Sequence, residues 1–226
     1  MRADFVFVHG FTQTAGSWAP VMELLSTTDT QSLAVPVADD FTATAAALDV
    51  GPATYVGYSQ GGRLCLQLAL DRPEVVHRLV LVSASPGIAD EQERTARRDA
   101  DERLAQEIER DGVDAFLERW LAQPLFATLP RERSGIDERR ARNTIEGLTS
   151  QLRVLGQGVQ PSNWERLGGL RMPVLLIVGE RDTRYVEIAQ RMADAIPRAR
   201  VEVVSGAGHA CHLEQPEMVA HLLSSW

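Results

Sequence analysis

The chain has 226 residues, of which 44% are hydrophobic and 24% are charged, and its formal net charge is −8. This acidic balance argues against a nucleic acid or an anionic membrane as a partner, because both require a basic protein face. The length suits a single domain, and no hydrophobic run approaches the ~18 residues that a membrane-spanning helix needs.

Short β-branched runs alternate with helical patterns over the first part of the chain, which indicates parallel β-α-β units. The predicted strands are residues 4–10, 32–38, 53–59 and 77–85, and the predicted helices between them are residues 17–25, 42–50 and 61–73. Such units place helices on both faces of a sheet and bring ligands to the carboxyl ends of its strands.

The pattern changes after residue 86, because residues 87–169 contain no strand signal and read as charged helices with scattered apolar positions. Strands resume at residues 173–180 and 199–206, with helices at 186–196 and 215–224. The sequence therefore predicts the α/β class: a doubly wound, mostly parallel sheet of about six strands. Residues 1–86 and 170–226 form the core, and residues 87–169 form a helical lid inserted after the fourth predicted strand.

A serine stands between glycines at the end of the third predicted strand, in the sequence GYSQGGR that contains Gly57, Ser59 and Gly61. A strand, a tight turn and a helix around such a serine form a nucleophile elbow, in which the glycines relieve crowding and the hydroxyl projects above the sheet. We expect Ser59 to be the catalytic residue rather than a small residue in an ordinary turn.

A serine of this kind needs a histidine to take its proton and an acid to orient the histidine, in the chain order Ser, Asp or Glu, His. Asp182 and His209 each follow a predicted strand and fit that order. Glu180 is the rival acid and His212 the rival base. The other two histidines considered, His77 and His221, are expected at the surface or in helix packing.

The turn after the first predicted strand, in FVHGF, can aim a backbone amide at a developing negative charge. We expect the amides of Phe11 and Gln60 to form an oxyanion hole. The alternative is an ordinary turn between a strand and a helix.

The chain gives no reason to expect a metal or a cofactor. Cys65 and Cys211 have neither the spacing of a metal site nor that of a disulfide framework, so we expect two buried thiols. The N-terminal sequence lacks the features of a signal peptide, so a cytoplasmic location is expected. A monomer and a homodimer both stay open.

The motifs FVHGF, GYSQGGR, LLIVGERD and GAGHACHLEQP resemble the α/β-hydrolase family over nearly the whole chain. Within it, the segments EQERTARRDADER, RWLAQPLFATL and VQPSNWERL are similar to the 2-succinyl-6-hydroxy-2,4-cyclohexadiene-1-carboxylate (SHCHC) synthases of menaquinone biosynthesis. Relatives usually carry a longer glycine-rich loop after the second strand, so one pocket wall is shortened here.

The resemblance implies a lyase that eliminates pyruvate from an enolpyruvyl ether, 2-succinyl-5-enolpyruvyl-6-hydroxy-3-cyclohexene-1-carboxylate. In such a lyase the triad of serine, histidine and aspartate acts as the base, and the molecule that it binds is a small polycarboxylate substrate. A guanidinium can grip a carboxylate through two hydrogen bonds, which explains an arginine one helical turn after the serine. The substrate contacts that the resemblance implies are Tyr58, Arg63, Arg97, Trp120 and Arg140.

Two other classes of function remain open. An esterase, thioesterase or C–C hydrolase needs the same triad without the arginines, and a non-catalytic ligand sensor needs neither. All 23 basic residues are arginine, so many arginines of the insert are expected to pair with nearby carboxylates, as in the i,i+4 pair of Glu93 and Arg97. Trp120 fits a structural anchor of the insert equally well.

Overall fold

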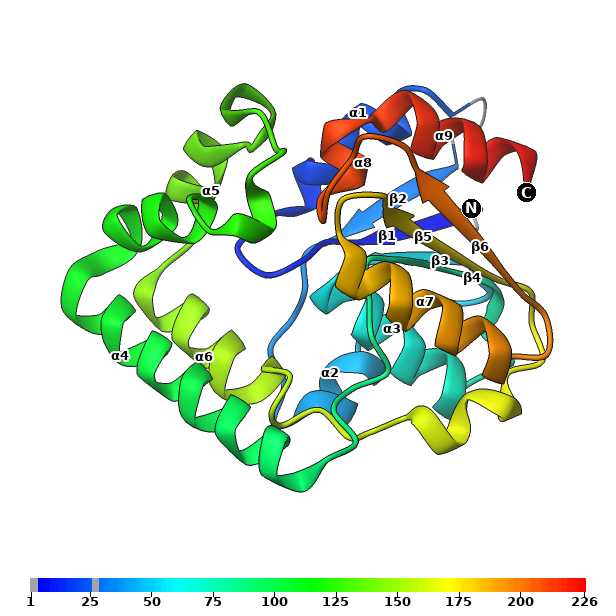
Figure 1. Ribbon diagram of the computed structural model, residues 1–226, viewed down its shortest axis with the longest axis horizontal. Coiled ribbons are helices and arrows are strands. Elements are labelled where there is room, and N and C mark those ends of the chain that lie inside the picture. The colour runs from blue at the N-terminus through cyan, green and yellow to red at the C-terminus, as the bar shows by residue number, and fades with distance from the viewer. Residues whose placement is uncertain (1–3, 26–28) are drawn as a thin grey trace.

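The computed structural model describes residues 4–25 and 29–226, and its centre is a parallel β-sheet flanked by helices (Figure 1). Within those residues the sheet has six strands, ordered β2-β1-β3-β4-β5-β6 and all parallel. The strands are β1 (Phe5–Val8), β2 (Thr30–Leu33), β3 (Ala53–Tyr58), β4 (Val76–Val82), β5 (Val174–Gly179) and β6 (Ala199–Val204). The prediction of a parallel sheet of about six strands is confirmed.

The second strand is shorter than predicted and lies nearer the N-terminus. Its last pairs with β1 join Phe7 to Ser32 and Val8 to Leu33, so it ends at Leu33 instead of continuing to residue 38. After that, the amide of Val35 donates to ring nitrogen Nε2 of His9 at 3.1 Å, and the next residue is a proline, which has no amide to donate. The chain therefore turns away from the sheet after Leu33.

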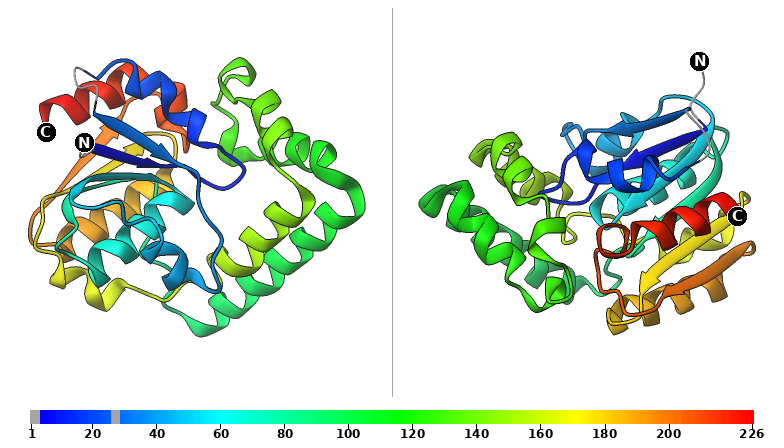
Figure 2. Two further views of the ribbon diagram at one scale, coloured as in Figure 1. Left: turned by 180° about the vertical axis from the view of Figure 1, so that it is seen from behind. Right: turned by 90° about the horizontal axis from the view of Figure 1, so that it is seen from above.

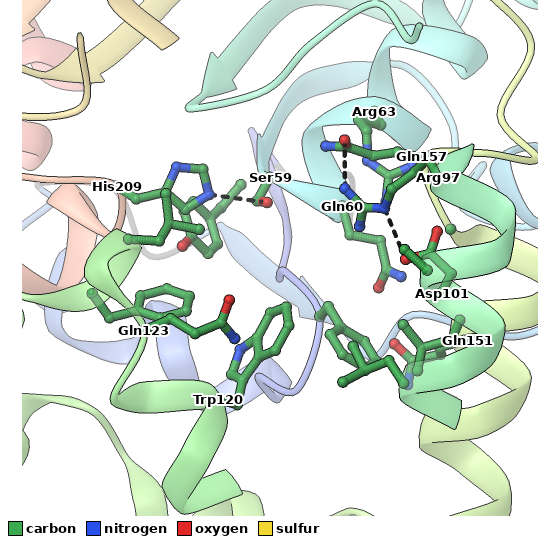
Figure 3. A pocket seen from close by; sticks show the side chains of 18 of the residues that line it. Ser59, Gln60, Arg63, Arg97, Asp101, Trp120, Gln123, Gln151, Gln157 and His209 are labelled. Carbon is green, nitrogen blue, oxygen red and sulfur yellow. Dashed lines mark hydrogen bonds and ion pairs between the residues drawn. The ribbon is translucent and has the colours of Figure 1, made fainter. Parts of the chain in front are cut away.

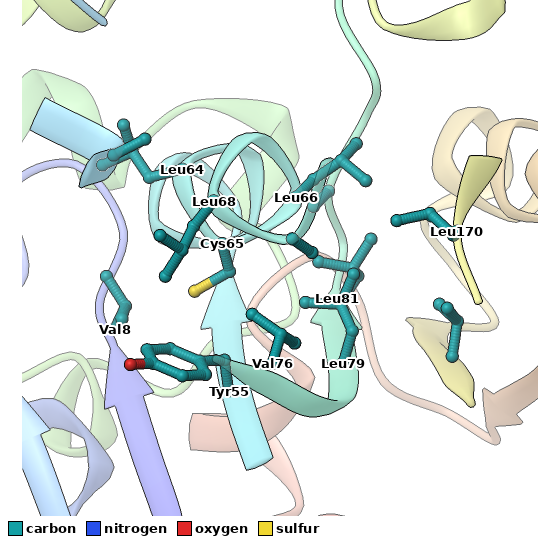
Figure 4. Packing of buried hydrophobic residues seen from close by; sticks show 14 of the residues in the cluster. Val8, Tyr55, Leu64, Cys65, Leu66, Leu68, Val76, Leu79, Leu81 and Leu170 are labelled. Carbon is teal, nitrogen blue, oxygen red and sulfur yellow. The ribbon is translucent and has the colours of Figure 1, made fainter. Parts of the chain in front are cut away.

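Helices cover both faces of the sheet (Figure 1). One face carries α2 (Phe41–Ala46), α3 (Gln60–Asp71) and α7 (Thr183–Ala195), whose apolar side chains join one buried cluster with the strands. Figure 4 shows part of this cluster, in which Cys65 and Leu68 of α3 lie near Tyr55 of β3. The other face carries η1 (Ala15–Trp18), α1 (Ala19–Met22), α8 (Cys211–Glu214) and α9 (Pro216–Ser225) over a second cluster. The predicted helix 17–25 is thus replaced by two short elements, η1 and α1, whereas the predicted helix 215–224 is found as α9.

Between β4 and β5 the described chain is helical and contains no strand. We call this segment the helical insert; its elements are α4 (Glu91–Leu121), η2 (Pro124–Phe126), η3 (Arg131–Arg133), α5 (Ile136–Arg142), α6 (Ile145–Leu155) and η4 (Trp164–Gly169). Figure 2 shows that α4, α5 and α6 stand to one side of the sheet. Buried residues of α4 and α6, among them Ile108 and Leu148, form a separate hydrophobic cluster.

The long helix α4 is broken at Gly112, whose backbone has φ 81° and ψ 170°. A left-handed φ of this kind is open to glycine at little cost but strains other residues. The break divides α4 into two arms, one before and one after Gly112.

Cys65 and Cys211 are both fully buried free thiols, as predicted. Burial raises the pKa of each thiol. Within residues 4–25 and 29–226, no helix combines the length and the apolar character needed to cross a membrane.

Candidate active site

Ser59 lies between β3 and α3, at the carboxyl edge of the sheet. Its φ of 49° is left-handed, which is a strained conformation for a residue with a side chain. The start of α3 also lies very close to the strands. A Cβ on Gly61 would lie only 2.3 Å from the carbonyl oxygen of Val8, so this position admits glycine alone without a backbone shift.

Ser59, His209 and Asp182 form a continuous chain of hydrogen bonds. His209 Nδ1 lies 2.6 Å from Asp182 Oδ2, and His209 Nε2 lies 3.2 Å from Ser59 Oγ (Figure 3). A carboxylate only accepts, so Nδ1 carries the proton and Nε2 is left to accept from the serine hydroxyl. Asp182 and His209 are both buried, which fixes the imidazole in this orientation.

The rival acid and the rival base lie elsewhere. Glu180 accepts from the amide of Gly206 at 2.8 Å on the surface, and this bond lowers the pKa of Glu180. His212 is buried between Trp18 and Tyr58, and burial lowers its pKa well below the usual value. Among the described side chains, His209 is the only base that bonds to Ser59, and Asp182 is the only carboxylate that bonds to His209, so the geometry singles out these two.

Two backbone amides near Ser59 have no hydrogen-bond acceptor in the described chain. Gln60 is the first residue of α3, where no carbonyl of its own helix can reach its amide. Phe11 lies in the turn closed by the bond from Gln13 N to Gly10 O at 3.1 Å, which does not use the Phe11 amide. Both are the amides that the sequence predicts for an oxyanion hole.

A cavity of about 510 Å³ opens above Ser59, between the sheet edge and the helical insert. Besides Ser59 and His209, its lining includes four of the five predicted substrate contacts: Tyr58, Arg63, Arg97 and Trp120. Figure 3 shows Arg97 on the side of the cavity opposite His209, with Trp120 across from both. The cavity therefore joins the hydroxyl, the imidazole and two cations.

Arg63 is buried and is held by uncharged groups. Its guanidinium donates to Gln160 Oε1 at 3.0 Å and to the carbonyl oxygen of Leu155 at 2.8 Å. Burial lowers the pKa of Arg63 to about 10, so the side chain is still cationic at neutral pH. A buried cation without a carboxylate partner is costly unless an anion arrives, which fits a ligand-binding role.

Arg97 pairs with a different residue from the one predicted. Its Nε donates to Asp101 Oδ1 at 2.9 Å and its Nη1 to Gln157 Oε1 at 2.9 Å, whereas Glu93 is not its partner. Asp101 is buried, and its other oxygen has no partner in the described chain. The predicted Glu93–Arg97 pair was wrong because the side chain of Arg97 turns toward the cavity.

Arg140 does not line the cavity, so its position does not fit the predicted substrate contact. It pairs with Glu118 and with Asp137 on the outside of the insert. The neighbouring Arg139 is the buried arginine of α5 and lies near Tyr58; burial lowers the pKa of Arg139 to about 10. Successive residues point about 100° apart on a helix, so a shift of one position exchanges the buried and exposed faces.

Trp120 packs edge-on against Phe11, with ring centroids 5.2 Å apart, and its indole nitrogen has no partner in the described chain.

The sequence did not indicate Gln157 and Gln160, which bond to Arg97 and Arg63. Gln160 lies in the VQPSNW segment, which carries part of the resemblance, but no local pattern indicated its bond to Arg63.

Among the described residues, no group of histidine, cysteine, aspartate or glutamate side chains is arranged to hold a metal.

The chain matches the family profile described as alpha/beta hydrolase fold over residues 5–216. A Salmonella paratyphi B protein named 2-succinyl-6-hydroxy-2,4-cyclohexadiene-1-carboxylate synthase is 32% identical over 237 aligned positions, which cover 98% of this chain and 92% of that protein. A Bacillus subtilis protein that carries the same name provisionally is 41% identical over 175 residues, which are 76% of this chain and 64% of that protein.

A solved structure described as MenH from S. aureus superimposes on this chain with a TM-score of 0.91 at 27% sequence identity. The match covers 100% of this chain and 95% of that one. The similarity therefore includes the helical insert as well as the sheet.

Proposed function

Because this chain belongs to the alpha/beta hydrolase fold family, we propose that it is a carbon–oxygen lyase of the SHCHC synthase type. Its substrate would be 2-succinyl-5-enolpyruvyl-6-hydroxy-3-cyclohexene-1-carboxylate, a small polycarboxylate, and its products SHCHC and pyruvate. The observation that carries the proposal is that the hydrogen-bonded residues Ser59, His209 and Asp182 line the same cavity as two arginines. These arginines are Arg63 and Arg97.

Ser59 acts as the base in this proposal. Its hydroxyl passes its proton to His209 and takes one from the carbon beside the succinyl ketone, while Asp182 stabilises the imidazolium. The electron pair left on carbon moves through the conjugated system, and the C–O bond to the enolpyruvyl group breaks. The departing enolate takes up the proton held by His209 and becomes pyruvate, while Ser59 keeps the proton taken from carbon, so both residues return to their starting protonation states.

The amides of Phe11 and Gln60 would hold the oxygen of the succinyl ketone as negative charge develops on it. Arg63 and Arg97 would bind carboxylates of the substrate, and Tyr58 and Trp120 would enclose its ring. Arg63 is suited to this task because neither of its hydrogen-bond partners, the Gln160 side chain and the Leu155 carbonyl, carries a charge.

The main alternative is a hydrolase that uses the same triad on an ester. The experiment compares elimination of pyruvate with cleavage of a simple aryl ester by the native protein, Arg63→Ala and Ser59→Ala. We expect Arg63→Ala to lose at least about tenfold in elimination, or ~1.4 kcal/mol, with little change in ester cleavage. Ser59→Ala should lose both activities.

Arg110→Ala is the matched control, because Arg110 is exposed and pairs with Asp111 away from the cavity. Equal loss of both activities in Arg63→Ala would contradict a carboxylate-binding role. Ester cleavage without elimination in the native protein would favour the hydrolase.

A further inference from the structure

The loop of residues 10–14 after β1, which carries the Phe11 amide, has few hydrogen bonds of its own. Within it, Gln13 N donates to Gly10 O at 3.1 Å, and Gly10 N donates to Gln13 Oε1 at 3.2 Å. Thr12, at its centre, is fully buried and has a left-handed φ of 67°. A non-glycine residue keeps such a conformation only where its surroundings hold it.

Besides Ser17 and His212, which bond to Thr14 and Gln13, three residues that hold this loop come from the helical insert, which is distant from the loop in the sequence. Arg139 donates from Nη1 to the hydroxyl of Thr12, and Asn143 donates from Nδ2 to the carbonyl oxygen of Thr12 at 2.9 Å. Further along the loop, the hydroxyl of Thr14 donates to Glu138 at 2.6 Å. All three insert residues belong to α5 or to its C-terminal cap.

The side chain of Phe11 is also held by the insert. Its ring packs against Trp120 and against Phe116, with centroid distances of 5.2 Å and 6.1 Å. Helices α4 and α5 therefore fix both the backbone and the side chain next to the Phe11 amide.

We propose that Asn143 and Arg139 are positioning residues that aim the Phe11 amide through Thr12. Neither residue lines the cavity, so neither needs to touch the substrate. The inference rests on the proposed function, because it assigns the Phe11 amide to the oxyanion hole. It makes docking of α5 on the loop a condition for stabilising the developing anion.

Asn143→Asp tests this, since the carboxylate has the same shape but cannot donate to the Thr12 carbonyl. We expect kcat for elimination to fall about tenfold or more with KM little changed, because displacement of a catalytic group by ~1 Å can cost as much as 10²-fold. Arg142→Ala, an exposed substitution one residue earlier, is the control and should leave kcat unchanged.

A fluorophosphonate probe separates this inference from the identity of the substrate. The probe phosphonylates an activated serine, with fluoride as the leaving group, and it needs the oxyanion hole but not Arg63. We expect Asn143→Asp to slow labelling of Ser59 by a factor similar to its loss in kcat. Labelling that is slowed in a protein without elimination would support the inference and overturn the proposed lyase activity.

Thr12→Val and Thr12→Ser form the second pair, because only serine keeps the hydroxyl that accepts from Arg139. Labelling should be slow in Thr12→Val and restored in Thr12→Ser. Normal labelling rates in folded Asn143→Asp and Thr12→Val, or a change confined to KM, would overturn the inference.

Discussion

The guanidinium of Arg63 donates to the side-chain oxygen of Gln160 at 3.0 Å, and its other hydrogen-bond partner within the described residues is the carbonyl oxygen of Leu155. Arginines at the surface behave differently: Arg153, for example, pairs with Glu102 and Glu109. Neutral partners orient the guanidinium of Arg63 and leave its charge available to a carboxylate from solution.

Replacing Gln160 with glutamate should neutralise Arg63 and weaken substrate binding. We expect Gln160→Glu to raise KM for elimination about tenfold, because a carboxylate of the protein would compete with that of the substrate. Gln160→Met, which has a similar shape and no charge, should change KM less. Steady-state kinetics of the two variants provide the measurement, and equal KM values would show that the charge next to Arg63 is unimportant.

Replacing Ser59 with alanine should remove the proposed base. We expect elimination to slow by about 10²–10⁴-fold, the usual contribution of a positioned general base. Product binding should persist, because Arg63 and Arg97 are unchanged. Calorimetry with the product and a rate assay measure the two effects, and a variant that retains more than about a tenth of the rate would point to a different base.

Gly61→Ala should destabilise the fold and displace Ser59. The new Cβ would lie 2.3 Å from the carbonyl oxygen of Val8 and 2.5 Å from that of His9, and neither backbone atom can move cheaply. We expect the free energy of unfolding to fall by about 1–3 kcal/mol. Urea unfolding measures the change. Gly169→Ala is the control, because nothing lies within 4 Å of its Cβ position; a similar loss there would remove the steric explanation.

The sequence indicated that Ser59, Asp182 and His209 lie at one edge of the sheet, but not which groups Arg97 and Arg140 bond to, for a physical reason. Ser59, Asp182 and His209 each follow a parallel strand, and the carboxyl ends of parallel strands meet at one edge. The direction of the Arg140 side chain depends on how the short helix α5 is rotated about its axis. The buried arginine of that helix is Arg139, one residue earlier. The early end of β2 depends on the bond between Val35 and His9, which joins positions 26 residues apart.

The histidine in that bond should make stability depend on pH. His9 donates from Nδ1 to the carbonyl of Gly10 at 2.9 Å and accepts from Val35 at Nε2, so the fold requires its neutral form. Burial lowers the pKa of His9 to about 4. The unfolded chain binds the proton near pH ~6.5, so the contribution of His9 is complete above that pH and is lost as the pH falls toward 4.

The lowered pKa of His9 corresponds to a decrease of roughly 3 kcal/mol in the free energy of unfolding between those two pH values. Buried His212, whose pKa is also lowered, acts in the same direction. Urea unfolding at about pH 7.5, 5.5 and 4.5 measures the effect. His9→Gln cannot titrate and should show a shallower decrease; an unchanged decrease would mean that His9 is not responsible.

The break at Gly112 interrupts the regular backbone of α4 between its two arms. Both arms share one hydrophobic cluster with α6, through Ile108 before the glycine and Phe116 after it, and the second arm also carries Phe116 and Trp120 to the ring of Phe11. Because helical hydrogen bonds reinforce one another only along an unbroken run, fraying that starts in one arm stops at the glycine. Amide hydrogens of the two arms should therefore exchange with solvent at two different rates, although side chains of both arms pack in one cluster.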